Sequence, residues 1–245
     1  MEKILLEGFI SIKAALNSLH RDVEKIFISN KRRTRKTAFM KKLASSKEIS
    51  FEFVDSAKID SLAKGKTHGG FLAFADERKF STVNDLLNKG YKSCFYIEGI
   101  EDPYNLGITI RTLYSAGIDS IIIQSRNLSS VSSIISKSSA GTYEKMEIGM
   151  CENQLDTIKA YKEKDYSVYA ADQSETSKSL YDTSFGELTM VIVGGEKRGI
   201  TSDVVKLADQ LIHIPYGTYQ FGYSLPASVA STIISYEMLR QNLEK

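Results

Sequence analysis

Three short segments of this sequence combine glycines with polar side chains at spacings that suit ligand binding. The first is 101–111, the second is 194–199 and the third is 214–226. Each one follows an apolar run typical of a strand, and open α/β sheets bind ligands outside the carboxyl ends of their strands. The three segments therefore predict one shared site at one edge of a sheet.

In the first segment, a small residue precedes an arginine by one helical turn. Asn105 can cap the helix that follows an Asp-Pro turn, and Gly107 and Arg111 then share one helical face. On that face the guanidinium of Arg111 can bind phosphate oxygens bidentately. A structural ion pair between Arg111 and Glu98 or Glu101 explains the same pattern, so both interpretations stay open.

The second segment is a glycine turn with one carboxylate, Glu196, directly after an apolar strand. Gly194 and Gly195 can let backbone amides approach a ligand closely. An ordinary helix-entry turn would use the same glycines. The segment lacks both the dinucleotide fingerprint and the Gly-Lys-Ser/Thr ending of a nucleoside-triphosphate loop, so a Rossmann cofactor or ATP is poorly supported.

The third segment joins a strand end at Ile214 to a helix that starts near Ser224. Four aromatic residues lie between these two points, and they could stack on RNA bases or cover the core of their own loop. His213 alternates inside the preceding strand and is predicted to be structural. The three histidines and two cysteines are scattered, so we expect neither a metal site nor a disulfide.

From residue 93 onward, one repeating pattern of strands and helices is expected to position these three segments. Apolar strands alternate with helical stretches, which predicts an α/β fold with a parallel sheet and helices on both faces. The expected strands are Cys94–Ile100, Ser120–Gln124, Tyr166–Ala171, Thr189–Gly194 and Gln210–Ile214. The expected helices are Leu106–Ala116, Ser129–Lys137, Leu155–Lys162, Ser202–Ala208 and Pro226–Asn242. The last helix has a broad apolar surface, which should pack on the sheet, on a second copy of the chain, or on both.

The front third of the chain is predicted to form a separate small α/β module. Its expected helices are Ile10–Leu19 and Phe39–Ala44, and its expected strands are Val23–Ser29, Ser50–Val54 and Gly69–Ala75. A charged connector and a new helical stretch from Val83 follow. We therefore expect domains at 1–78 and 91–245, joined by a linker at 79–90.

The charges of the chain are unevenly distributed. Residues 1–80 contain 17 lysines and arginines against 10 aspartates and glutamates, although the net charge of the whole chain is only +2. Much of this excess lies in one run, which we expect to contact the phosphates of RNA: Lys31, Arg32, Arg33, Arg35 and Lys36. A solvated surface loop is the alternative interpretation of such a run.

The bulk composition is that of an ordinary globular protein. Hydrophobic residues make up 42% of the 245 residues and charged residues 25%. Apolar runs long enough to cross a bilayer are absent from the sequence, and the first residues lack the layout of a secretion signal. We therefore expect a cytoplasmic protein without a membrane partner.

Taken together, the three segments closely resemble the SpoU (TrmH) family within the SPOUT superfamily. The family-like residues are Asp102, Pro103, Asn105, Gly107 and Arg111, then Gly194, Glu196 and Gly199, then Ile214, Pro215, Ser224 and Leu225. Ser138–Thr142 is similar to a small-residue stretch of the family. The front module, with Glu7-Gly8 and His68-Gly-Gly70, looks like the ribosomal-protein-L30-like RNA-binding domain of many members.

The resemblance implies transfer of a methyl group from S-adenosylmethionine to a ribose 2′-hydroxyl of RNA, with rRNA favoured over tRNA. It also implies a trefoil knot in the carboxyl half and a homodimer built around that knot. The resemblance assigns cofactor contacts to Gly194, Gly195, Ile214, Leu225 and Ala230. It assigns the catalytic pocket to Asn105, Arg111, Glu196 and Ser224, with no metal.

One departure from the family pattern puts cofactor affinity and substrate choice in question. The pattern continues Ser-Leu-Asn, whereas this chain has Pro226 after Leu225. A catalytically silent RNA-binding protein with the same fold is therefore an alternative, as is a tRNA methyltransferase. A pyrimidine-C5 enzyme would need an attacking cysteine, but Cys94 lies in a predicted strand and Cys151 matches no motif.

Overall fold

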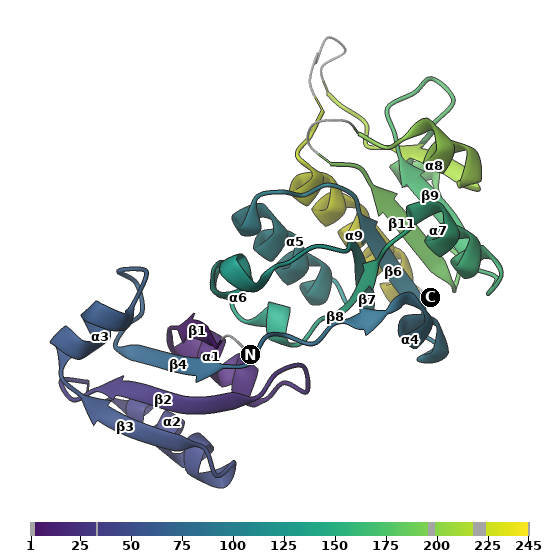
Figure 1. Cartoon of the computed structure of the whole chain (residues 1–245). Coiled ribbons are helices and arrows are strands. Elements are labelled where there is room, and N and C mark those ends of the chain that lie inside the picture. Colours follow the sequence, from purple (N-terminus) through teal and green to yellow (C-terminus); the bar gives the residue numbers. More distant parts are fainter. Residues whose placement is uncertain (1–2, 33, 196–198, 218–223, 245) are drawn as a thin grey trace. The chain divides into compact units, whose positions relative to one another are not determined.

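The structure is a computed structural model, and it describes residues 3–32, 34–195, 199–217 and 224–244 (Figure 1). The chain forms two compact units, each built from two stretches of sequence. The first consists of Met1–Lys79 and Asn127–Lys145, and the second of Phe80–Arg126 and Met146–Lys245. Every helix among the described residues is too short or too polar to cross a bilayer.

The first unit is built on a four-stranded sheet in the order β1-β4-β2-β3. β4 runs antiparallel to β1 and β2, whereas β2 and β3 are parallel. The strands are β1 (Ile4–Glu7), β2 (Val23–Ser29), β3 (Ser50–Val54) and β4 (Phe71–Ala75). The helices are α1 (Phe9–Leu16), α2 (Arg35–Ser46) and α3 (Ser56–Leu62).

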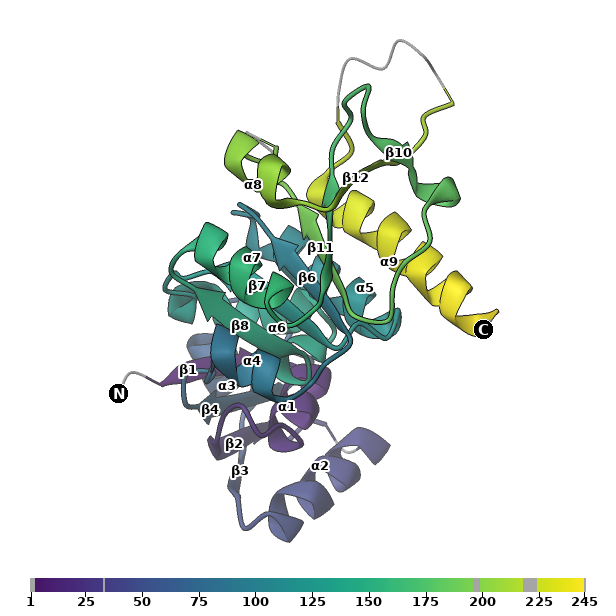
Figure 2. The ribbon, with the colours of Figure 1, turned by 90° about the vertical axis from the view of Figure 1, so that its right-hand side faces the viewer.

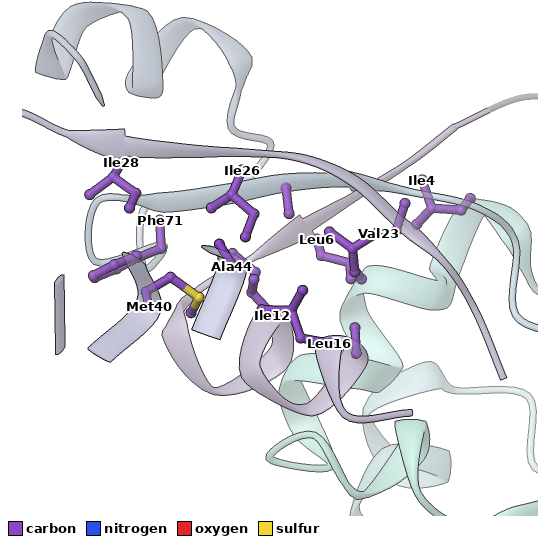
Figure 3. Packing of buried hydrophobic residues seen from close by; sticks show 13 residues of the cluster. Ile4, Leu6, Ile12, Leu16, Val23, Ile26, Ile28, Met40, Ala44 and Phe71 are labelled. Atoms are coloured by element: carbon purple, nitrogen blue, oxygen red, sulfur yellow. The ribbon is translucent and has the colours of Figure 1, made fainter. Parts of the chain in front are cut away.

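The two-residue period of strand β2 explains how helices cover both faces of this sheet. Ile26 and Ile28 are fully buried in a cluster with Ile12 of α1 and Met40 of α2 (Figure 3). Phe27, between them in sequence, belongs instead to a second cluster around Ile59 of α3. The alternation of β2 therefore positions α1 and α2 on one face and α3 on the other.

The segment 127–145 packs in the first unit, although it lies between two strands of the second unit in sequence. It contains the short helices η1 (Ser129–Val131), α6 (Ser132–Ser138) and η2 (Thr142–Glu144). Arg21 Nε lies 2.9 Å from Glu144 Oε2, and neither side chain is exposed. The Arg78 side chain donates a hydrogen bond to the backbone carbonyl of Tyr143 and stacks over its ring. These contacts fix the segment to the first unit.

The second unit contains an eight-stranded sheet in which every neighbouring pair is parallel, in the order β10-β12-β9-β11-β6-β7-β8-β5. Its strands are β5 (Ser81–Thr82), β6 (Ser93–Ile97), β7 (Ser120–Gln124), β8 (Glu147–Cys151), β9 (Ser167–Ala171), β10 (Lys178–Ser179), β11 (Thr189–Val193) and β12 (Gln210–His213). The predicted parallel sheet is confirmed.

Helices cover both faces of this sheet, as predicted. α4 (Val83–Asn88), α7 (Gln154–Lys162) and α8 (Ser202–Leu207) lie on one face (Figure 1). α5 (Pro103–Ser115) and α9 (Ala227–Leu243) pack together on the other. Tyr161 of α7 and Val204 of α8 are buried against alternate residues of the central strands, which explains the apolar character of these strands.

Strand β12 lies between two parts of one earlier segment of the chain, residues 167–188. It pairs with β9 on one side and with β10 on the other. Figure 2 shows β12 and β10 near the start of α9. Beyond β10 and the short helix η3 (Leu180–Asp182), Gln241 of α9 donates to the carbonyl of Thr183 and accepts from the amide of Phe185. The earlier segment therefore flanks β12 and also holds the helix that follows it.

The expected linker and the start of the last helix both differ from the sequence-based expectations. Residues 79–90, expected as a linker, contain β5 and α4, and Leu86 of α4 is fully buried in the second unit. Pro226 was expected as the first helical residue, but it occupies the N-cap position and α9 begins at Ala227. Its carbonyl accepts the first bonds of the helix, from the amides of Val229 and Ala230.

Candidate functional site

The carboxyl ends of β9, β11 and β12 lie side by side because these strands are parallel neighbours. The segments that follow them, together with the start of α9, enclose a cavity of about 190 Å³. Its wall includes all five residues assigned to the cofactor: Gly194, Gly195, Ile214, Leu225 and Ala230. Ser224 also lines the cavity, so the structure brings the second and third segments together.

The glycines of the second segment are required by the packing of the turn itself. A Cβ atom on Gly194 would lie 2.4 Å from the carbonyl carbon of Gly199, and one on Gly195 would lie 2.7 Å from the carbonyl oxygen of Glu98. Gly199 has a φ of +62° and donates to the carbonyl of Gly195. The helix-entry interpretation therefore accounts for these glycines, which also form one wall of the cavity. Glu196 lies outside the described residues.

Hydrogen bonds hold the third segment in place along the cavity. The amide of Leu225 donates to the hydroxyl of Tyr216 at 3.1 Å, and the carbonyl of Ile214 accepts from the side chain of Gln173 at 3.0 Å. Nδ1 of His213 lies 3.0 Å from the carbonyl of Ser177. His213 thus has a local partner, as expected of a structural histidine. Of the four aromatic residues of this loop, Tyr216 is described and the other three fall outside the described residues.

Asn105 and Arg111 of the first segment both lie on α5, but neither lines this cavity. The cap of α5 is Asp102, whose carboxylate accepts from the amides of Tyr104 and Asn105. The prediction that Asn105 is the cap is therefore wrong, because the acid before proline occupies that position. Arg111 is exposed, and among the described residues no ion pair joins it to Glu98 or Glu101.

Glu98 is a residue near the cavity that the sequence suggested only as an ion-pair partner. It follows β6 directly, and its amide donates to the carbonyl of Val193 at the end of β11. One carboxylate oxygen, Oε2, is buried and has no hydrogen-bond partner among the described residues. A buried oxygen of this kind is costly unless another group binds it. The only feature of the sequence that could have indicated Glu98 as a site residue is its position directly after an apolar strand.

Neither cysteine offers an accessible nucleophile. Burial raises the pKa of the Cys94 thiol to about 11, so it stays protonated at neutral pH. Cys151 is also buried, and its sulfur lies 3.5 Å from the hydroxyl of Tyr96. The described residues contain no cluster of histidine, cysteine and acidic side chains that could hold a metal ion.

The basic run expected to contact RNA lies in the first unit and is divided by the structure. Arg32, Arg35 and Lys36 line a second cavity in that unit, at the start of α2. Lys31 is exposed and is not part of the wall of that cavity. Arg33 lies outside the described residues.

Comparison with known proteins matches both parts of the chain. Residues 92–236 match the SpoU rRNA methylase family model, and residues 5–81 match the model for RNA 2′-O ribose methyltransferase substrate binding. A protein of Staphylococcus saprophyticus assigned to the TrmH family of tRNA/rRNA methyltransferases is 28% identical, and the match covers 98% of this chain and 97% of that protein.

A second sequence relative and a solved structure also match almost the whole chain. The 23S rRNA (guanosine-2′-O-)-methyltransferase RlmB of Bordetella pertussis is 25% identical, with 97% of each chain covered. The SpoU methyltransferase AviRb of Streptomyces viridochromogenes, solved in complex with AdoMet, shares the fold with a TM-score of 0.79 at 18% identity, covering 98% of this chain and 91% of that one. Since the methylase model spans more than half of the sequence, this chain belongs to the SpoU family of S-adenosylmethionine-dependent RNA 2′-O-ribose methyltransferases.

Proposed function

We propose that this protein methylates a ribose 2′-hydroxyl in ribosomal RNA, with the cofactor bound in the cavity at the ends of β9, β11 and β12. The observation that carries this proposal is the convergence of Gly194, Ile214, Ser224 and Leu225 on that one cavity. Ribosomal RNA is favoured over tRNA because a 23S rRNA enzyme matches the chain over 97% of its length.

The cavity suits the less polar parts of the cofactor. Ile200, Ile214 and Leu225 provide apolar wall, while the turn at Gly194 and Gly195 brings backbone close to the cavity without side chains. Adenosine-like groups need this combination of apolar surface and backbone polar groups. Pro226 has no polar side chain, whereas Ser224, two residues before it, lines the cavity. When bound, S-adenosylmethionine supplies an electrophilic methyl group on a sulfonium.

The remaining task of the protein is to align the ribose oxygen and to manage its proton. Proximity and alignment supply much of the rate in such a displacement. An arginine guanidinium stays protonated at neutral pH, so Arg111 is proposed to orient the ribose or its phosphate and to stabilise the forming alkoxide. Asn105, Glu196 and Ser224 are proposed to complete the pocket. The proton passes to the adjacent phosphate or to water.

A homodimer through the carboxyl-terminal domain is part of the proposal. Tyr104, Ile108 and Arg111 recur along one stripe of α5, and all three side chains are exposed. Tyr236 of α9, which packs beside α5, is also exposed. A second copy covering this apolar surface would remove it from water and would also place Arg111 at the interface.

We further propose that the chain is knotted in this domain and that residues 1–78 form an L30-like RNA-binding domain. The knot is supported by the position of β12, which lies between β9 and β10 of the single segment 167–188. The L30-like assignment is supported by the mixed four-stranded sheet with helices on both faces. A cytoplasmic location follows from an rRNA substrate.

The proposed function is tested by incubating the protein with labelled S-adenosylmethionine and total bacterial RNA. We expect label in rRNA, at a nucleotide whose 2′-oxygen is methylated, as read by mass spectrometry of the digested RNA. Label confined to tRNA would support the tRNA alternative. If RNA is bound but no RNA fraction is labelled, the catalytically silent alternative is correct.

A further inference from the structure

The first unit contains a cavity of about 530 Å³ that the proposed methyl transfer does not use. The cavity is formed by the end of β1, the first turns of α1 and α2, the loop 67–69, and Lys137 with Ala140. Its volume falls within the range of about 300–1,000 Å³ that is typical of ligand pockets. All of its wall residues belong to the first unit, so the cavity is complete within that unit.

The wall combines aromatic rings with cations. The rings of Phe9 and Phe71 lie 5.6 Å apart in an edge-to-face arrangement, and both residues line the cavity. The ammonium group of Lys36 lies 5.6 Å from the centre of the Phe9 ring. Arg32 and Arg35 complete the basic part of the wall. A ring beside several cations can accept a base by stacking and its phosphates by charge.

The local backbone keeps this basic wall accessible to an anion. α1 starts after Gly8, which has a φ of +93° and no side chain to cap the first amides of the helix. A Cβ atom on Gly70 would lie 2.9 Å from Cγ of Arg32, so glycine leaves the space that the Arg32 side chain occupies. Glycines at these two positions thus allow both the helix start and Arg32 to border the cavity.

The acidic and imidazole groups of the wall already have partners. The Glu7 carboxylate is nearly buried and accepts hydrogen bonds from the amides of Lys64 and Gly65. Its second oxygen lies 3.4 Å from Lys137 Nζ. His68 accepts from the amide of Gly70 through Nδ1, and its Nε2 lies 3.2 Å from a carboxylate oxygen of Asp60. The negative charge of Glu7 is therefore compensated, and the free charges of the wall are positive.

We propose that this cavity binds one unstacked nucleotide of the substrate RNA, with the base against Phe9 and its phosphates on Arg32, Arg35 and Lys36. The inference rests on the proposed function only in that the substrate is an RNA. Exposed lysines, Lys41 and Lys42, continue along α2 beyond the cavity and offer contacts to flanking phosphates. An RNA chain could contact both the cavity and these lysines, whereas a free mononucleotide could contact only the cavity.

Two charge-matched double variants on α2 test the phosphate contacts. R35A/K36A removes two cations that line the cavity, and K41A/K42A removes two exposed cations of the same helix that do not. We expect R35A/K36A to raise the Kd for an unmodified 23S rRNA transcript by about tenfold or more, and K41A/K42A by about threefold or less. Equal losses in the two variants would mean diffuse electrostatic attraction and would overturn the proposal.

A second matched pair tests stacking. Phe9→Leu removes the ring from the cavity while keeping an apolar side chain, and Phe39→Leu changes a neighbouring ring, 5.9 Å away, that does not line it. We expect Phe9→Leu to raise the Kd about fivefold or more with an unchanged dependence on salt, and Phe39→Leu to have little effect. Equal effects of the two would contradict base stacking.

Controls separate this inference from the proposed function. Calorimetry with S-adenosylmethionine should give the same affinity for every variant, and thermal unfolding followed by circular dichroism identifies any variant that fails to fold. If Phe9→Leu does not fold, the two double variants decide the question alone. If the unaltered protein methylates no RNA but the double variants still differ as expected, the proposed function fails and the nucleotide site stands. If it methylates RNA and the double variants bind alike, only the nucleotide site fails.

Discussion

At the scale of single residues, Arg111 differs from the residues assigned to the cofactor. The glycines, Ile214, Ser224 and Leu225 line one cavity, whereas Arg111 lies exposed on α5 outside that wall. We therefore propose that Arg111 contacts the substrate and not the cofactor. The structure therefore separates a residue proposed to act on RNA from residues proposed to hold the methyl donor.

Arg111→Ala should reduce methyl transfer by about 100-fold or more, because a charged donor aimed at the forming alkoxide contributes on that scale. The affinity for S-adenosylmethionine should change by about twofold or less, since Arg111 does not line the cavity. Single-turnover assays and calorimetry measure the two quantities. A parallel loss of transfer and cofactor binding would show that Arg111 has a structural role, and Arg111→Lys serves as the charge-preserving control.

Cys94 is expected to make stability depend on alkaline pH. Burial raises its pKa from 9.0 to about 11, so between these values the unfolded chain loses a proton that the folded chain retains. The stability contribution of the thiol is complete below pH 9 and is lost as the pH rises through 11. Cys94→Ala should therefore lose less stability than the unaltered protein over this interval, as measured by urea unfolding at several pH values. Parallel declines would contradict the assignment.

At the scale of elements, α9 both borders the cavity and holds the segment 167–188. Gln241 links the two: its side chain donates to the carbonyl of Thr183 and accepts from the amide of Phe185. Glu237, whose pKa is lowered mainly by hydrogen bonds from Arg240, accepts from the same Gln241 side chain. One side chain thus joins the end of the helix to the segment that flanks β12.

Gln241→Ala should destabilise the second unit by about 1–3 kcal/mol, because it leaves the amide of Phe185 and the carbonyl of Thr183 without their partner. Hydrogen exchange should become faster at Phe185 and in the strand β12. Asn242→Ala, at an exposed neighbouring position, is the control. Unchanged exchange at these sites would show that the segment is held by other contacts.

Much of this element order could be predicted from hydrophobic pattern alone. The expected limits of β2, β3 and β7 agree with the structure, because their apolar residues fill complete strands between polar turns. Strand β8 was not predicted, since Glu147 and Gly149 interrupt its apolar pattern and its pairing with β7 is a tertiary effect. Helix α3 was missed for a similar reason, because only Ile59 of its seven residues is buried.

The candidate site was predictable in part. Motif order located the residues that line the cavity, because strand ends of a parallel sheet lie at one edge. The buried oxygen of Glu98 and the nucleotide-sized cavity around Phe9 depend on contacts between residues distant in sequence. Periodicity and spacing within a short segment carry no information on such contacts.

At the scale of the whole molecule, a second copy of the chain is expected to cover α5 and α9. Ile108→Glu would place a charge in that apolar surface and should convert the dimer to a monomer, as measured by light scattering. Methyl transfer should fall together with dimerisation, because Arg111 lies on the same stripe of α5. Leu19→Glu, at an exposed apolar position of the first unit that does not line its cavity, is the control. A monomeric unaltered protein would refute the proposed dimer.

A buried ion pair joins the two stretches of sequence that form the first unit. Arg21 and Glu144 have no exposed side-chain surface, so Glu144→Gln leaves an uncompensated cation in the interior. We expect a loss of about 3–5 kcal/mol in the free energy of unfolding. The double variant R21M/E144M should recover much of this loss, because it removes both charges. Urea unfolding measures the free energy of unfolding of both variants. A Glu144→Gln variant as stable as the unaltered protein would contradict the expectation.

The placement of residues 127–145 in the first unit limits how chimeras can be made between this chain and its relatives. The main chain passes between the two units three times, after residues 79, 126 and 145. A fragment ending at residue 79 would leave Arg21 and Arg78 without Glu144 and Tyr143. Exchanging the first unit of this chain for that of another protein therefore requires replacing residues 127–145 as well as residues 1–79, because a single crossover would separate these two stretches.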